Sequence, residues 1–599
     1  SRYGSTHPVF EHCPIGFEEC SKMASPFKLS TLAPFLHMCW FIPVAYAETN
    51  VVVRTDVGSV LGVVNGTLYG SGSSGRPNIA SFMGIPYALP PLGHGRFRPP
   101  KPHPAWEGVR SAKVPGPVCA QLPLISGINV PEALRPHVTE DCLYLNVWAP
   151  VDMNGSIVGK RPVLIFLHGG GFMTGSGYQM LGMPFYNAQG LADDTKTVIV
   201  TINYRLGVFG YLADPVLKQE SGTTGNYGLQ DQRAAMFWVQ RNALAFGGDG
   251  ARITIIGESA GAASVLHHAV LPRSSGLFAQ VISESGYDKT WSLHAAYSAG
   301  QELINHVGCH DLALRSECLR NASAKTLLEA QAKVFFGGGS DFMSRAMFFG
   351  PVSDGFELPE NMTFPQAVEA AKPNVPLLIG TNLNETNLFL CLDKSLSKIS
   401  WPHAAKYLLD KVAMLFPGSN ATVTTMEQVL QQYSNFATPR DAVMAAATDF
   451  LFTCAARRTA RAFAASAAPV YRYLFGRPPA MYKADHCLGV PHAAELSLLF
   501  RDAFPKPAQR VVVGDAVELQ LADFIISAWG RFAWGLLPDT TWPRWNSSET
   551  TVRIGDSETG SVTSLLGYRS DECSTMDPLI TLGYQQTVTS NGHENVVFV

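Results

Sequence analysis

The sequence predicts an α/β protein built around a large, mostly parallel β-sheet that is flanked by helices. Near-continuous apolar runs of strand length occur at 163–167, 197–203 and 252–256, which is typical of strands covered on both faces. Segments with helical periodicity, such as 228–246 and 260–270, lie between or after these runs. Strands that alternate with helices form a parallel sheet with helices on both faces.

The predicted elements follow one another along the whole chain. A β-hairpin is expected over 51–64, and the proline density between 82 and 100 excludes helix there. The helix at 228–246 is expected to place Phe237 and Leu244 on its apolar side. Further strands are predicted at 279–283, 376–380, 469–475 and 552–554 (the last as an edge strand), further helices at 514–534, and mainly helical regions at 290–370 and 401–465.

Charge and organisation narrow the class of protein. The 599 residues include 45 Lys and Arg against 48 Asp and Glu, a formal charge of −3. This balance gives no reason to expect nucleic acid or an acidic membrane surface as a partner. No internal repeat, low-complexity linker or run of like charge marks a boundary, so residues 48–599 are interpreted as one domain.

Residues 23–47 have the pattern of a secretory signal peptide. A basic start at Lys28 is followed by the apolar stretch 29–46, which ends in Ala-Tyr-Ala at 45–47. We expect cleavage near Ala47, with residues 1–22 as an upstream extension outside the fold. Prolines within the apolar stretch argue against the alternative of a membrane anchor, and no later stretch is long and apolar enough to span a bilayer. Secretion is the predicted location.

Secretion makes the cysteines and the glycosylation sequons informative. Three of the eleven cysteines precede the expected cleavage, and an oxidising compartment favours pairing among the other eight. Six Asn-X-Ser/Thr sites are predicted to carry sugar: Asn65, Asn154, Asn321, Asn361, Asn420 and Asn546.

The segment 257–261, Gly-Glu-Ser-Ala-Gly, lies between a predicted strand and a predicted helix. Gly-x-Ser-x-Gly in that setting is the nucleophile elbow. The glycines avoid Cβ clashes while Ser259 is held in a strained turn, and the helix N-terminus places a positive dipole where an oxyanion would form. Taken alone, these five residues leave open an ordinary serine in a tight turn.

A serine nucleophile needs a base, and the base needs an orienting acid. The chain order for this elbow is serine, acid, histidine. Glu385 follows the strand at 376–380, and His492 lies in a loop after the strand at 469–475. Asp354 is an alternative acid, although its Asp-Gly pair favours a turn, and His486 is an alternative base.

These motifs together resemble those of the type-B carboxylesterase/cholinesterase family, which has the α/β-hydrolase fold. The likeness runs from about residue 58 to 579. Segment 140–147 is similar to the second signature of the family, and 257–261 is similar to its nucleophile signature. The motifs at 168–172, 231–233 and 246–249 also fall where the family has them.

The resemblance implies roles for individual residues. Ser259 would be the nucleophile, His492 the base and Glu385 the acid. Backbone N–H groups would form the oxyanion hole, each contributing about 3 kcal/mol. The donors implied for it are Gly170, Gly171 and Ala260.

Four residues lie directly beside the proposed triad residues in the sequence. Glu258 is interpreted as a buried structural carboxylate satisfied by nearby hydrogen bonds. The family usually has glycine where this chain has Thr386 and Ala493. Since Ala adopts most conformations that Gly uses at negative φ, we expect Ala493 to matter little. Asn384 also begins a sequon, but sugar there would lie beside a buried acid, so we do not expect it.

The resemblance also implies disulfides between Cys119 and Cys142 and between Cys309 and Cys318. Cys454 and Cys573 lie in sequence contexts like those of the third cholinesterase bridge, and closing so long a loop would add more than about 4 kcal/mol in the chain-entropy model. Cys391 and Cys487 remain; we expect two buried free thiols, with a fourth bridge as the alternative.

The resemblance therefore implies a secreted serine carboxylic-ester hydrolase that acts on a small-molecule ester through an acyl-enzyme, with no metal or organic cofactor; the motifs carry no information on oligomeric state. Choline-specific members place a Trp in the first disulfide loop, and residues 120–141 contain no Trp, Phe or Tyr, so cholinesterase activity is not expected. A lipase-like esterase is one alternative. A neuroligin-like adhesion ectodomain is another, and the complete set of triad residues argues against it.

Overall fold

The computed structural model describes residues 49–581, except for 65–77, 123–136, 153, 158, 181, 338–348, 361, 417–418, 504–513 and 557–558. The signal peptide predicted at 23–47, the extension 1–22 and the sequons at Asn65 and Asn361 lie outside the described residues. Of the helices within these described ranges, none combines the length and the apolar character needed to cross a bilayer.

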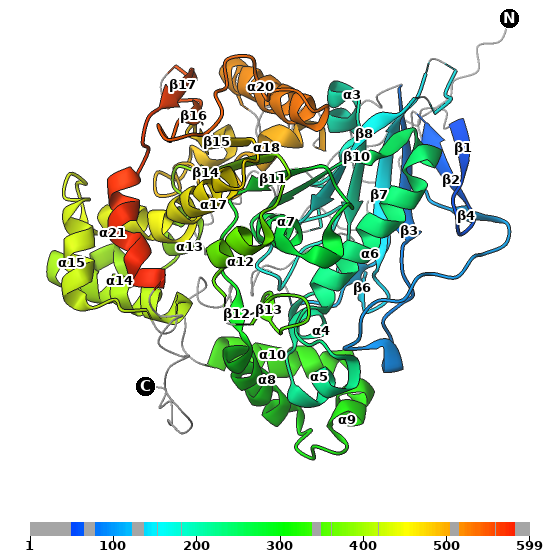
Figure 1. Cartoon of the computed structure of the whole chain (residues 1–599), viewed down its shortest axis with the longest axis horizontal. Helices are drawn as coiled ribbons and strands as arrows, with labels where there is room; N and C mark the ends of the chain where they lie inside the picture. The colour runs from blue at the N-terminus through cyan, green and yellow to red at the C-terminus, as the bar shows by residue number, and fades with distance from the viewer. Residues whose placement is uncertain are drawn as a thin grey trace, which may run out of the picture. The chain divides into compact units, whose positions relative to one another are not determined.

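A 13-stranded sheet forms the centre of the described chain (Figure 1). Seven neighbouring strands, in the order β9-β8-β10-β11-β14-β15-β16, are parallel, and antiparallel strands extend the sheet at both ends. The strands are β1 (Thr49–Arg54), β2 (Ser59–Val64), β3 (Ile79–Pro86), β4 (Val109–Ser111), β7 (Tyr144–Pro150), β8 (Arg161–Leu167), β9 (Val198–Ile202), β10 (Gly248–Glu258), β11 (Gln280–Glu284), β14 (Leu377–Asn382), β15 (Val470–Phe475), β16 (Thr551–Ile554) and β17 (Val562–Leu565). The predicted fold class is confirmed.

Helices flank this sheet: α7 packs on β10 and β11, α6 on β10, α20 on β8 and β10, and α17 on β14 and β15. The helices are α3 (Gln189–Thr195), α4 (Gly207–Tyr211), α5 (Pro215–Ser221), α6 (Tyr227–Asn242), α7 (Ala260–Val270), α8 (Leu293–Val307), α9 (Arg315–Asn321), α10 (Ala324–Gly337), α12 (Phe364–Ala371), α13 (Asn387–Leu390), α14 (Trp401–Leu415), α15 (Val423–Gln431), α16 (Pro439–Thr448), α17 (Cys454–Ala465), α18 (Leu496–Leu499), α20 (Ala516–Ala533) and α21 (Ser570–Thr581). Two small two-stranded sheets pair β5 (Val118–Cys119) with β6 (Val138–Thr139) and β12 (Trp291–Ser292) with β13 (Val352–Ser353).

Two details of the sequence prediction are wrong. Strand β16 is not the edge, because β17 pairs with it antiparallel and leaves β16 between two neighbours. In the helix predicted over 228–246, Phe237 and Leu244 are 43% and 66% exposed. Each residue advances 100° around a helix, so Phe237 faces away from the buried side that carries Ala235 and Val239. The helix also ends at Asn242, and a 3-10 turn at 243–246 carries Leu244 outward.

The arrangement of the sheet brings the predicted site residues to one edge. Strands β10, β11, β14 and β15 are parallel neighbours, so their carboxyl ends lie together. Ser259 follows β10 directly, Glu385 comes three residues after β14, and His492 lies in the chain after β15.

Four disulfides join the eight cysteines that follow the expected cleavage site. Cys119–Cys142, Cys309–Cys318 and Cys454–Cys573 are the three pairs that the resemblance implies. The fourth joins Cys391 to Cys487, so the expectation of two free thiols is wrong. The Asn387 side chain donates to the carbonyl of Cys487 at 2.7 Å, which shows that two loops 96 residues apart in sequence meet here.

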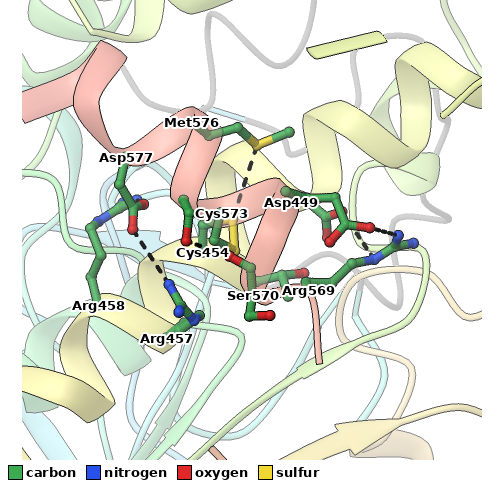
Figure 2. Close-up of a disulfide and its surroundings, with 12 residues drawn as sticks. Asp449, Cys454, Arg457, Arg458, Arg569, Ser570, Cys573, Met576 and Asp577 are labelled. Carbon is green, nitrogen blue, oxygen red and sulfur yellow. Dashed lines mark hydrogen bonds and ion pairs between the residues drawn. A yellow bond between two sulfur atoms is a disulfide. The ribbon is translucent and has the colours of Figure 1, made fainter. Parts of the chain in front are cut away.

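The C-terminal helix α21 is fastened to α17 by covalent and ionic contacts (Figure 2). Beside the Cys454–Cys573 bridge, Arg458 forms an ion pair with Asp577. Arg458 also pairs with Asp288, which lies in the segment after β11. The end of the described chain is therefore tied to a segment that leaves the edge of the sheet where Ser259 lies.

Candidate active site

The turn that carries Ser259 is shaped by the space its neighbours leave. Ser259 has φ 57° and ψ −122°, and its N–H donates to the carbonyl of Glu284 at 2.9 Å. A Cβ on Gly261 would lie 1.9 Å from the carbonyl oxygen of Leu167 on β8, and a Cβ on Gly257 would lie 2.4 Å from Gly261. Only glycine fits at these two positions, so the Gly-x-Ser-x-Gly pattern follows from the packing of β10, α7 and β8.

Glu385 and His492 are in direct contact. The imidazole Nδ1 of His492 lies 2.6 Å from Glu385 Oε2, and the His492 N–H donates to the Glu385 carbonyl at 3.2 Å. The other carboxylate oxygen of Glu385 accepts from the Asn382 N–H at 2.6 Å. Both oxygens of this fully buried carboxylate are therefore used, and the ring of His492 is fixed by its contact with one of them.

The two alternative residues lie elsewhere. Asp354 accepts hydrogen bonds from the Thr223 hydroxyl at 2.6 Å and the Glu357 N–H at 2.8 Å, so its buried carboxylate holds a turn together. His486 is exposed. Neither contacts Ser259 or Glu385.

The loops around Glu385 and His492 are joined by Asn384. Its N–H donates to the Val490 carbonyl at 3.0 Å, and its side-chain oxygen accepts from the Val490 N–H at 3.1 Å. Next to it, the buried Thr386 donates from its hydroxyl to the Met444 carbonyl at 2.8 Å, which gives a physical reason for a threonine at this position.

The backbone conformation of Ala493 differs from the one that the sequence interpretation assumed. Its φ is +64°, in the left-handed region that favours glycine. The interpretation assumed a negative φ at Ala493, and that assumption is wrong, although His492 still contacts Glu385. The residue directly after His492 is therefore strained by about 1 kcal/mol.

Glu258 contacts His492, which its interpretation as a purely structural carboxylate did not include. Its Oε1 lies 3.2 Å from Nε2 of His492, and its side chain is buried. Burial raises the pKa of the Glu258 carboxyl. Burial lowers the pKa of His492, but the carboxylates of Glu258 and Glu385 raise it more, so the pKa of the imidazole lies above its usual value. Nε2 of His492 thus contacts the side chain of the residue directly before Ser259.

Two more buried carboxylates lie near Glu258, Glu385 and His492. Glu495 accepts from the Asn382 side chain at 2.5 Å, and Glu284 accepts from the indole N–H of Trp529 at 2.7 Å. Burial and the neighbouring Glu385 raise the pKa of Glu495 to about 7. Glu284 has no role in the sequence prediction, although a carboxylate at the end of an apolar strand beside the elbow is a signal that could have identified it.

The glycine turn at 169–171 lies against the nucleophile. A Cβ on Gly169 would be 2.9 Å from Ser259 Cβ. Gly170 and Gly171 have φ of +104° and +62°, and a Cβ on Gly170 would be 2.1 Å from the Thr174 carbonyl oxygen. The backbone of the glycine turn thus approaches Ser259 from one side. On the other side, helix α7 begins at Ala260, and its first N–H groups lack partners within the helix.

Aromatic rings enclose the imidazole. The rings of Phe452 and Phe389 lie with their centroids 4.8 and 5.4 Å from that of His492. The described ranges contain no group of three or more His, Cys, Asp or Glu arranged to hold a metal ion.

The chain is similar in sequence and in fold to known proteins. The model of the carboxylesterase family matches residues 49–572. The para-nitrobenzyl esterase of Bacillus subtilis is 33% identical over 526 residues, covering 85% of this chain and 96% of that protein. The liver carboxylesterase of Sus scrofa is 30% identical, with 84% of this chain and 89% of that protein covered. Among solved structures, a PNB esterase aligns with a TM-score of 0.70 and 30% identity over 88% of this chain and 100% of that one.

Fold, site and relatives thus define a large α/β-hydrolase with a serine elbow. The chain belongs to the carboxylesterase family, and it is a carboxylic ester hydrolase.

Proposed function

We propose that the protein is a secreted serine carboxylesterase in which Ser259 is the nucleophile, His492 the general base and Glu385 the residue that orients it. The observation that supports this assignment best is the double contact of His492. Its Nδ1 lies 2.6 Å from Glu385, while its Nε2 lies 3.2 Å from Glu258, the residue directly before Ser259. Acyl transfer requires a base that is held at one ring nitrogen and has the other near the nucleophile.

The reaction then follows in two halves. His492 takes the hydroxyl proton as Ser259 Oγ bonds to the carbonyl carbon, and the oxyanion is held by the N–H groups of Gly170, Gly171 and Ala260. The bond from that carbon to the alcohol oxygen breaks, and His492 passes the proton to the leaving alcohol. Water then loses a proton to His492, attacks the acyl-enzyme and releases the acid as Ser259 recovers its proton.

Secretion and glycosylation form part of the same proposal. The four disulfides are consistent with an extracellular protein. The described sequon residues Asn154, Asn321, Asn420 and Asn546 are exposed, as sugar attachment requires. Asn384 uses its side-chain oxygen to hold Val490, so we do not propose sugar there.

Hydrolysis of 4-nitrophenyl esters from acetate to palmitate, for the wild type and for Ser259→Ala, tests the proposal. We expect the highest kcat/KM for short acyl chains and a fall of about 10⁵-fold or more in the variant. A long-chain preference that rises at an oil–water interface would identify a lipase instead. Equal, near-background rates for both proteins would contradict the assignment of Ser259.

A further inference from the structure

Lys289 is a buried lysine that forms no ion pair with any residue that the structure describes. The residue is 8% exposed, and its Nζ lies 4.0 Å from the centroid of the Trp291 ring. Within the ranges that the structure describes, no carboxylate and no hydrogen-bond acceptor pairs with this ammonium group. Burial lowers the pKa of Lys289 to about 7, and no neighbouring charge offsets this effect.

The adjacent carboxylate is turned to another partner. Both oxygens of Asp288 are engaged by Arg458, with Oδ2 2.9 Å from Nε and Oδ1 3.0 Å from a terminal guanidinium nitrogen. Arg458 is in turn held by Asp577 on α21 (Figure 2). The backbone thus fixes Asp288 toward α17 and leaves Lys289 without the nearest acid in the sequence. The ammonium form of Lys289 is therefore destabilised by burial, and an anion bound from outside the chain would stabilise it.

The segment that carries Lys289 starts beside the nucleophile. Its first contact is the hydrogen bond from Ser259 to the Glu284 carbonyl at the end of β11. A Cβ on Gly286 would meet the Cβ of Ala262, in the first turn of α7, at 3.0 Å. Lys289 follows three residues later.

Tyr287, two residues before Lys289, contacts Phe172, which directly follows the glycine turn 169–171. The ring of Tyr287 lies edge-on to that of Phe172, with centroids 6.4 Å apart. Beyond Lys289, Trp291 and Phe172 flank the same glycine: a Cβ on Gly350 would lie 3.3 Å from Phe172 and 3.5 Å from Trp291. Lys289 therefore lies between Tyr287, which contacts the residue after the proposed oxyanion turn, and Trp291, which shares the neighbour Gly350 with that residue.

From these contacts we propose that Lys289 and Trp291 form an anion subsite of the active site, and that the protein accepts esters whose acyl or alcohol part carries a carboxylate. This inference rests on the proposed function, because the ester is placed by Ser259. The substrate carboxylate pairs with the Lys289 ammonium, and the ring of Trp291 holds that ammonium from its other side. The reactive step itself is unchanged.

Two matched pairs of esters test the subsite, each pair comparing an anionic ester with a neutral one of similar size. The acyl side is tested with mono-4-nitrophenyl glutarate against 4-nitrophenyl pentanoate. The alcohol side is tested with 4-carboxyphenyl acetate against 4-methylphenyl acetate. The readout is the ratio of kcat/KM for the anionic ester to that for the neutral ester, so a general loss of activity cancels.

We expect Lys289→Met to lower this ratio about 30-fold in at least one pair, because an anionic substrate loses its buried partner. Lys289→Arg keeps the positive charge and should restore most of the ratio. The matched control is Lys406→Met on α14, which removes an exposed lysine that pairs with Asp410 and should leave both ratios unchanged. Ratios that Lys289→Met changes by less than about threefold in both pairs would overturn the proposal.

Calorimetric titration with glutarate separates this result from a failure of the proposed function. If the wild type hydrolyses none of these esters, the proposed function fails, and binding alone decides the subsite. Glutarate that binds Ser259→Ala and not Ser259→Ala/Lys289→Met supports the subsite. Equal binding to both variants, or none to either, contradicts it. Thermal unfolding of Lys289→Met checks that the long, apolar Met side chain preserves the fold.

Discussion

The two halves of the proposed triad are built in different ways. The nucleophile half is one continuous piece of chain, 252–270, in which strand, turn and helix follow directly and glycine clearances fix the turn. The half that carries the acid and the base is assembled from two loops 107 residues apart, joined by backbone and side-chain hydrogen bonds and by Cys391–Cys487. The first half depends on local geometry, and the second on tertiary contacts.

This difference gives each half its own weak point. The nucleophile turn has no room for an added atom, whereas the acid and base loops depend on particular partners. Substitutions therefore act through steric overlap in the first half and through lost contacts in the second.

The largest effect is expected for Glu385→Gln. The glutamine amide cannot hold the His492 imidazole in the tautomer that leaves Nε2 free to accept a proton, so kcat/KM should fall about 10⁴-fold, or about 5.5 kcal/mol in the barrier. Steady-state kinetics measure this loss of kcat/KM, and circular dichroism checks that the fold is unchanged. The exposed Glu302→Gln on α8 is the control. A loss below tenfold would mean that another group orients His492.

The second-largest effect is a loss of unfolding free energy when a disulfide is removed. Replacing Cys391 and Cys487 by Ser removes a bridge that closes a 96-residue separation, worth about 4.7 kcal/mol in the chain-entropy model. The same change at Cys309 and Cys318, nine residues apart, should cost about 2.6 kcal/mol. Urea unfolding measures the loss of unfolding free energy for both pairs. Only the first pair should also lower kcat/KM, since it joins the Glu385 and His492 loops; equal activity losses would contradict this distinction.

Gly261→Ala tests the nucleophile half. Its Cβ would overlap the Leu167 carbonyl oxygen, and overpacking of this kind costs about 3 kcal/mol of unfolding free energy. The control is Gly95→Ala, where the nearest atom would lie at 3.7 Å, an ordinary contact. Similar unfolding free energies for the two variants would show that the turn tolerates a side chain.

The pH dependence of the reaction tests the contact between the two halves. The base must be neutral, so kcat/KM rises as pH increases through the pKa of His492. The carboxylate of Glu258 raises that pKa, and Glu258→Gln removes this charge. The rising limb of the pH profile should therefore move to lower pH. A limb that stays in place, or moves to higher pH, would contradict the assigned contact.

The smallest effect is expected for Ala493→Gly. Glycine relieves the left-handed strain at φ +64° but loses more backbone entropy on folding, so the gain should lie within about 1 kcal/mol. Thermal unfolding measures this gain, and Ala494→Gly at the next, buried position is the control that should destabilise. Destabilisation by Ala493→Gly would mean that the methyl group packs favourably.

The same difference explains what the sequence could predict. The parallel strands and the elbow follow from periodicity and from residues close in sequence, and the structure has them where the patterns predict. The Cys391–Cys487 bridge, the left-handed Ala493 and the contact of Glu258 with His492 depend on which loops meet in space. No local sequence pattern predicts which of these loops come into contact. The exposed Phe237 shows a further limit, because an apolar residue on a helix need not face the core.

Labelling with diisopropyl fluorophosphate is the most direct test of the central claim that Ser259, His492 and Glu385 act together. Attack by the serine oxygen forms a phosphoester, the P–F bond breaks and fluoride leaves, while His492 takes the hydroxyl proton. Mass spectrometry should find one adduct per chain, on the peptide that contains Ser259. The adduct should be absent in Ser259→Ala and should form far more slowly in His492→Gln and Glu385→Gln. An adduct that persists in Ser259→Ala, or labelling of Ser259 at the wild-type rate in both other variants, would contradict the triad.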